Sequence, residues 1–291
     1  MPELHPLGAF DLRRSLAFLE GWPPTAGEHG DAFLDFTYCT PGDWTPTTVR
    51  VTQENRTLRV DASRTVTDEL LADVARILSV DVDATPLSRI AAADPVVAAR
   101  LKAAPGLRPV LFWSTWEAVC WSVLSHRTSM RAASTVSRRV RRETGPRVTW
   151  QGEERAAFPP PRQVVDADTL PGVEPPRLAR LQALAEAALD GTLDAAALRA
   201  LPTEKAVERL GQLPGVGPFY AGLILVRGAG APDVLPASEP RLRERMRSAY
   251  GLAKDAPEER YREIGEQWRP LRSWCAFLLR AAPESKPGPK A

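Results

Sequence analysis

The residues best suited to chemistry are a short glycine-containing loop and one acidic residue that follows it. The loop runs from Leu213 to Pro218 with the order Leu-Pro-Gly-Val-Gly-Pro. Gly215 and Gly217 can adopt positive φ and carry no Cβ, so backbone N–H groups here can approach a phosphate closely. Glu239, at the head of a later predicted helix, supplies a carboxylate. Together they predict a site that grips a nucleotide strand and presents a carboxylate to it.

Two predicted helices must position this loop. Residues 203–210 combine helix-forming residues with apolar side chains on one face, and Gly211 ends the pattern. Pro218 suits the first position of the next helix, predicted over about 218–227. The positive end of that helix points at the same phosphate, an arrangement that binds anions without sequence preference.

Three ordered blocks resemble the helix-hairpin-helix DNA glycosylases, and within them the 3-methyladenine DNA glycosylase II (alkylbase) branch. The blocks are Leu213–Ala221 running into Leu225–Gly228, then Asp233–Pro236 leading to Glu239 and 242–246, and finally Trp268–Ala276 with its Trp-x-Pro-x-Arg-Ser-aromatic signature. A weaker fourth block covers 118–136. The resemblance implies a family clamp on duplex DNA, in which Leu213, Gly215, Val216 and Gly217 bind the strand.

The expected fold is an α+β N-terminal domain followed by a mostly α-helical region. Residues 11–20 and 67–78 have helical spacing, and residues 32–38, 47–51 and 57–60 alternate as antiparallel strands do. This layout resembles the TBP-like N-terminal domain of the alkylbase glycosylases, which we assign to 1–85. We predict an all-helical glycosylase region over 86–282, interrupted by an irregular proline-rich surface connection near 158–161, and a disordered tail over 283–291.

The resemblance implies a monofunctional DNA glycosylase of base-excision repair that extrudes damaged purines, alkylated or related, and releases them by hydrolysis. The family's catalytic aspartate matches Glu239, which is one methylene longer. Glu239 could instead be only a helix N-terminal acid favoured by the dipole. The alternative function is a lesion-binding relative that keeps the clamp and has weakened or lost catalysis.

The predicted base pocket contains fewer large rings than the family pattern. Phe219 keeps one aromatic position, whereas Leu223 and Leu271 replace larger rings, so the surface that would stack a cationic base is thinner. Trp113, in the same stretch as Trp116 and Trp121, is either a pocket ring or part of the core. We infer an altered or narrowed lesion range. Phe219 also replaces the lysine of strand-cutting relatives, which excludes a Schiff base at that position.

Further contacts with DNA are expected from basic side chains. His126 and Arg127 match the loop whose side chains enter the gap left by the extruded base, although a solvated loop is the alternative. Six arginines between 131 and 147 could face phosphates or solvent. The resemblance implies that Arg272 organises the site by pairing with a carboxylate.

Composition agrees with a soluble intracellular enzyme, and the resemblance implies a monomer of a bacterial-type cytoplasm that binds damaged double-stranded DNA. The chain has 291 residues, 44% of them hydrophobic, and a net charge of +2, so affinity for DNA must come from the placement of arginines. Three scattered cysteines favour a reducing compartment and cannot ligate an iron–sulfur cluster. No signal peptide, membrane span or catalytic metal site is expected, and no cofactor beyond a monovalent cation at the hairpin, which the resemblance implies.

Overall fold

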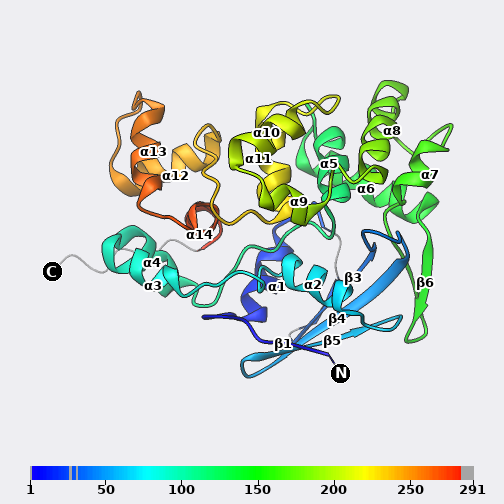
Figure 1. Cartoon of the computed structure of the whole chain (residues 1–291), viewed down its shortest axis with the longest axis horizontal. Coiled ribbons are helices and arrows are strands. Elements are labelled where there is room, and N and C mark those ends of the chain that lie inside the picture. Colours follow the sequence, from blue (N-terminus) through cyan, green and yellow to red (C-terminus); the bar gives the residue numbers. More distant parts are fainter. Residues whose placement is uncertain (1, 26–27, 31, 283–291) are drawn as a thin grey trace.

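The computed structural model describes residues 2–25, 28–30 and 32–282, so the tail predicted over 283–291 lies outside the described residues. Figure 1 shows a twisted sheet below a broad layer of helices. The sheet is antiparallel with the order β1-β5-β4-β3-β2. Its strands are β1 (Glu3–Leu4), β2 (Glu28–His29), β3 (Phe33–Cys39), β4 (Pro46–Glu54) and β5 (Thr57–Ala62). The three longer strands confirm the predicted sheet.

Two helices cover the apolar face of this sheet. These are α1 (Leu12–Glu20), capped by Asp11, and α2 (Asp68–Ile77), capped by Thr67. Alternate residues of the strands point toward the helices. In one such row, Val51 of β4 lies opposite Val60 of β5 on one side and opposite Leu34 of β3 on the other. The resulting buried cluster confirms the predicted sheet with flanking helices. The proposed domain boundary at residue 85 stays a prediction.

A second buried cluster joins chain segments that are far apart in sequence. It combines α3 (Pro86–Ala93) and α4 (Pro95–Ala103) with α12 (Pro240–Tyr250), α13 (Glu258–Glu266) and α14 (Arg272–Ala281). The buried carboxylate of Asp94 caps α4 and also accepts hydrogen bonds from Trp268 Nε1 at 2.9 Å and from Tyr250 Oη at 2.6 Å. This polar link fixes the two groups of helices against each other.

A third cluster surrounds α5 (Thr115–Leu124), every residue of which is buried. Around it pack α6 (Met130–Thr144), α7 (Pro161–Val165), α8 (Pro175–Leu189), α9 (Ala195–Ala200), α10 (Thr203–Gly211) and α11 (Pro218–Leu223), which continues as the π-helical segment η1 (Ile224–Ala229). The predicted helix over 218–227 is therefore present, but its second half is π-helical. None of the helices in the described ranges is long and apolar enough to cross a bilayer.

The region 86–282 is not all-helical, because β6 (Arg147–Trp150) and β7 (Glu153–Ala156) form a two-stranded antiparallel hairpin. Its turn places Gln151 at φ 53° and Gly152 at φ 81°. Positive φ at both central residues matches the twist of a tight hairpin, for which glycine at the second position is favourable. No strands were predicted here, because each strand is only four residues long and its alternating pattern is weak.

Candidate active site and nucleic-acid interface

A cavity of about 220 Å³ lies between the second and third hydrophobic clusters. One wall comes from α11 and η1, and the other from the 234–239 loop and α14. The lining includes Phe219, Leu223, Arg227, Glu239, Phe277 and Arg280. Phe219 is 49% exposed, an unusual position for a large apolar side chain, and it leaves a ring accessible beside the cavity.

Glu239 is the carboxylate of this cavity and the N-cap of α12. The residue is only 8% exposed. Its Oε2 accepts a hydrogen bond from the Leu242 N–H at 2.9 Å and pairs with Arg280 Nη1 at 2.8 Å. No residue within the described ranges donates to Oε1. One oxygen is therefore held by two donors, and the other is free for a ligand.

A second guanidinium, that of Arg227, lines the same cavity from η1. The residue is 5% exposed, donates to the Val110 carbonyl at 2.6 Å, and lies 3.8 Å from the centroid of the Trp22 ring. Burial, together with the nearby charge of Arg280, lowers the pKa of Arg227 well below its usual range. An arginine remains protonated despite such a shift, so the cavity wall carries a buried positive charge.

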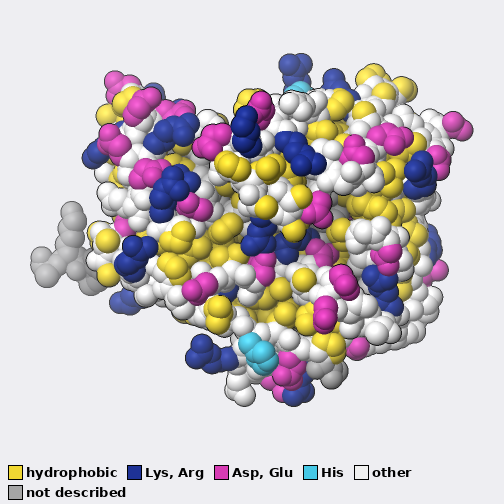
Figure 2. Space-filling model, viewed as in Figure 1, with side chains coloured by type: hydrophobic (Ala, Val, Ile, Leu, Met, Phe, Trp, Pro, Cys, Tyr) yellow, Lys and Arg dark blue, Asp and Glu magenta, His cyan; other side chains and the backbone are white. Residues whose placement is uncertain are grey.

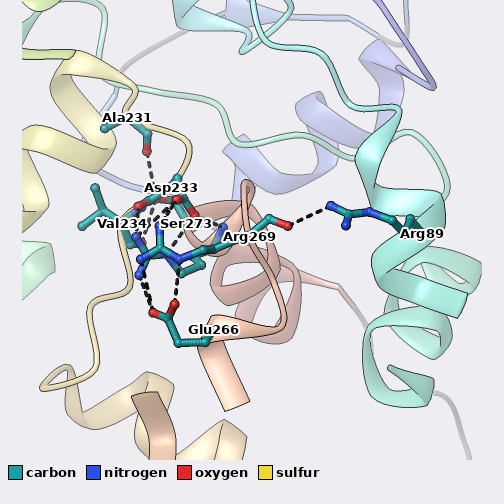
Figure 3. A network of polar contacts seen from close by, with 8 residues as sticks. Arg89, Ala231, Asp233, Val234, Glu266, Arg269 and Ser273 are labelled. Carbon is teal, nitrogen blue, oxygen red and sulfur yellow. Dashed lines mark hydrogen bonds and ion pairs between the residues drawn. The ribbon is translucent and has the colours of Figure 1, made fainter. Parts of the chain in front are cut away.

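The loop that delivers Glu239 is anchored to the start of α14, as Figure 3 shows. Ser273 Oγ lies 2.8 Å from the Ala231 carbonyl and 2.9 Å from that of Val234, and it accepts from the Val234 N–H at 3.0 Å. Arg272 pairs with Asp233, Nε to Oδ1, at 2.8 Å. The Arg-Ser pair of the third sequence block therefore holds the 231–234 segment, which fixes where Glu239 begins α12. Arg272 thus pairs with a carboxylate, and its role in organising the site stays a prediction.

The glycine loop joins α10 to α11 and presents open backbone N–H groups. Gly215 has a φ of 79°, whereas Gly217, with a φ of −79°, does not need a left-handed conformation. Both glycines are exposed, and neither donates a backbone hydrogen bond to any residue that the structure describes. Val216 is buried and Leu213 packs against the third cluster, so these two anchor the loop. The donors therefore face outward on a fixed support.

Arg180, which sequence reasoning missed, lies against this loop. A Cβ added to Gly215 would lie 3.3 Å from Arg180 Cδ, so the α8 side chain passes directly beside the turn. Arg180 is exposed, and no described residue forms a hydrogen bond or ion pair with it. A free guanidinium beside open backbone donors makes an anion site.

The loop after α5 presents a second exposed arginine. Arg127 has a φ of 52°, which is rare for a residue with a side chain, and no described residue pairs with it. Arg177 of α8 holds the flanks of this strained residue through the His126 carbonyl at 3.1 Å and Thr128 Oγ1 at 3.0 Å. The His126 ring lies 6.0 Å from that of Tyr220 on α11. The loop and the glycine turn are thus tied to the same helices.

Comparisons with known proteins agree with this geometry. No family model matches the chain. The chain is 23% identical over 222 residues to a DNA-3-methyladenine glycosylase of Bacillus subtilis, covering 73% of this chain and 71% of that protein. It is 32% identical over 208 residues to a probable bifunctional transcriptional activator/DNA repair enzyme of Mycobacterium tuberculosis, covering 70% of this chain and 40% of that protein. The solved 3-methyladenine DNA glycosylase of Archaeoglobus fulgidus superposes with a TM-score of 0.79 at 20% identity, covering 96% and 97% of the two chains.

The chain is similar over most of its length to helix-hairpin-helix DNA glycosylases, and its sequence relatives are named as enzymes of the alkylbase branch. Within that superfamily fold, α10, the 212–217 turn and α11 form the helix-hairpin-helix element. Glu239 begins α12 on the far side of the cavity from it.

Two of the four residues predicted for the base pocket do not reach the cavity. Phe219 and Leu223 line it, but Trp113 and Leu271 do not. Trp113 precedes the Ser114 cap of α5 and stacks on Phe36 of the sheet, with ring centroids 4.5 Å apart. Leu271 is 1% exposed and belongs to the second cluster. Trp113 is thus part of the core, which was one of the two alternatives for this residue.

The arginine-rich stretch after residue 130 is only partly available to phosphates. Arg141 is buried and pairs with Glu117 at 2.8 Å, and Arg147 pairs with Glu154 at 2.6 Å. Glu117 and Glu154 approach these arginines through the fold, so the local sequence pattern does not show either pair. Acidic and basic side chains are similarly interspersed over the face drawn in Figure 2. Among the described residues, no group of three or more acidic, cysteine or histidine side chains could hold a metal ion.

Arg227 and Arg280 were the site residues that sequence reasoning missed. Each is a lone charge within or at the end of an apolar helical segment, Leu225–Val226 before Arg227 and Ala276–Leu279 before Arg280. A charged side chain on an otherwise apolar stretch is rarely buried without a functional partner, and Arg227 is buried, whereas Arg280 is exposed at the end of α14. A single arginine in an apolar helical segment was therefore the feature of the sequence that could have identified these residues.

Proposed function

We propose that this protein is a monofunctional DNA glycosylase of base-excision repair that hydrolytically releases damaged purines from double-stranded DNA. The observation that carries the proposal is the carboxylate of Glu239, which lines the cavity with Oε2 held by two donors and Oε1 free. Relatives in the same branch are named as 3-methyladenine DNA glycosylases. We further propose that it acts as a monomer in a bacterial-type cytosol.

The reaction follows from the arrangement of these groups. The damaged nucleotide rotates out of the duplex, and its base enters the cavity past the exposed ring of Phe219. When the N-glycosidic bond breaks, the base leaves with the bonding electron pair and positive charge develops on the sugar. Glu239 stabilises that charge and accepts a proton from the water that adds to the sugar carbon. The departing base takes up a proton from solvent.

The clamp holds the strand while this happens. Backbone N–H groups of Gly215 and Gly217, together with Arg180, bind one phosphate. The carbonyls of Gly215 and Val216 accept no hydrogen bond from the described residues, so they suit the monovalent cation that the resemblance implies between hairpin and phosphate. Such a cation would neutralise charge on the strand.

The loop after α5 contacts the gap that the extruded nucleotide leaves. Arg127 fills this gap in the duplex, and His126 faces the unpaired base.

Replacing Glu239 tests the proposal. We expect Glu239→Gln to lower single-turnover base release from duplexes containing hypoxanthine or 7-methylguanine by about a hundredfold or more, because the neutral amide cannot offset charge on the sugar. The matched control is Glu244→Gln on the exposed side of the same helix, which should keep the wild-type rate. Affinity for the same duplexes should persist in both variants.

An unchanged rate in Glu239→Gln removes this residue from the mechanism. Binding of lesion-containing duplexes without release by the wild-type protein favours the alternative of a lesion-binding relative without efficient catalysis. Borohydride should trap no covalent adduct, because Phe219 has no amine.

A further inference from the structure

The cavity that would receive the base contains more positive than negative charge. Arg227 and Arg280 both line it, and the lining carboxylate is Glu239. Arg262 also contributes to the lining, but it pairs with Glu258 on α13. Because the carboxylate of Glu239 pairs with Arg280, no carboxylate of the cavity lining balances the positive charge of Arg227.

The surroundings of Arg227 do not neutralise it. No carboxylate among the described residues pairs with its guanidinium, and its Nε, buried from solvent, has no hydrogen-bond partner there. The compensation comes from aromatic rings, since Trp22 lies 3.8 Å and Phe277 lies 5.5 Å from the guanidinium carbon. Aromatic faces attract cations, and these two faces are already directed at Arg227. Phe277 is therefore not free to stack on a positively charged base.

We infer that this pocket selects neutral damaged purines that present hydrogen-bond acceptors, such as the deaminated base hypoxanthine, over cationic methylated purines. The inference rests on the proposed function and specifies its substrate class. A cationic base would meet a buried like charge at low effective dielectric, which is unfavourable. A carbonyl oxygen and a ring nitrogen side by side, as in the O6 and N7 of a 6-oxopurine, are the acceptors that a guanidinium binds best. Methylation at N7 removes one of these acceptors and adds the charge.

The wild-type protein gives the first test. Single-turnover release is measured from duplexes containing hypoxanthine or 7-methylguanine, and each rate is divided by the spontaneous loss of that base from the same duplex. This division removes the intrinsic weakness of the bond to a cationic base. We expect the enhancement for hypoxanthine to exceed that for 7-methylguanine by about tenfold or more. An equal or smaller enhancement overturns the inference while leaving the proposed function intact.

Variants of Arg227 assign the discrimination to its charge. Arg227→Met should lower the ratio of the two enhancements by about tenfold, whereas Arg227→Lys, which keeps the charge at similar length, should retain most of it. Arg260→Met makes the same change of charge on the exposed side of α13 and should leave the ratio unchanged. A ratio that falls equally in the Met and Lys variants overturns the inference. Release of neither base by the wild-type protein overturns the proposed function, and the inference with it.

Discussion

Glu239 has a longer side chain than the aspartate that the alkylbase pattern places here. The extra methylene extends the carboxylate toward α14. The same oxygen, Oε2, reaches both the N–H of Leu242 and the guanidinium of Arg280 on α14. Arg280 therefore acts as a positioning residue, because it fixes the carboxylate from across the cavity.

Shortening this side chain should impair the site even though it restores the family residue. We expect Glu239→Asp to lower the rate of base release by about a hundredfold, since the carboxylate would retract from Arg280 by about an ångström or more. The melting temperature should change little, because aspartate is among the preferred N-cap residues and can keep the cap of α12. Single-turnover kinetics measure the rate of base release, and thermal denaturation of the same preparation measures the melting temperature. A variant as fast as the wild type would show that Arg280 does not determine the position of the carboxylate.

Arg127 combines an unfavourable backbone with an exposed side chain. Its φ of 52° costs a residue with a Cβ about 1 kcal/mol, whereas glycine adopts it freely. We expect Arg127→Gly to raise the free energy of unfolding by up to about 1 kcal/mol while slowing base release about tenfold or more, because the side chain that fills the duplex gap is lost. Urea denaturation and single-turnover assays measure the two effects. Release at the wild-type rate would argue against the wedge role.

At the scale of elements, the link between the 231–234 segment and α14 determines where the carboxylate lies. Ser273→Ala removes the acceptor of the buried Val234 N–H, so we expect it to lower the free energy of unfolding by about 1–3 kcal/mol and to slow base release. Ser88→Ala, which removes an exposed serine bond to the Thr85 carbonyl on α3, is the matched control for urea denaturation. Equal stability of the two variants would mean that the segment is held by Arg272 alone.

The elements differ in how far the sequence could predict them. The glycine turn and the start of α11 were predictable because Gly215 and Pro218 act locally. The β6–β7 hairpin and the position of Trp113 were not, because each depends on packing against the sheet. Arg180, Arg227 and Arg280 meet their partners only through the tertiary fold, so no spacing in the sequence pairs them with the turn or with Glu239.

At the scale of the molecule, the candidate active site lies where two hydrophobic clusters meet. Clefts between packed units are common ligand sites because each side is rigid on its own. Here one cluster carries the clamp and the other carries Glu239 and Arg280. Catalysis thus requires both clusters to keep their relative position, to which Ser273 of α14 contributes through its hydrogen bonds to Ala231 and Val234 of the other cluster.

Buried thiols and phenols are distributed among these cores. Burial raises the pKa of Cys39 and of Cys275 to about 12. Burial also raises the pKa of Cys120 and Tyr38 well above their usual values. In Tyr250, burial and the hydrogen bond to Asp94 raise the pKa of the phenol. In the unfolded chain the same groups ionise near pH 8.5 for cysteine and near pH 10 for tyrosine.

These shifts predict that the whole molecule loses stability in alkali. A group whose folded pKa is raised binds more protons in the folded state, so its contribution is fully present below the unfolded pKa and is lost as pH rises toward the folded one. We expect the free energy of unfolding, measured by urea denaturation between pH 7 and 11, to start falling near pH 8.5 and to fall more steeply near pH 10. Replacing the three cysteines with alanine should remove the first part of the fall and leave the second. A free energy of unfolding that stays level or rises above pH 8.5 would contradict the burial of these side chains.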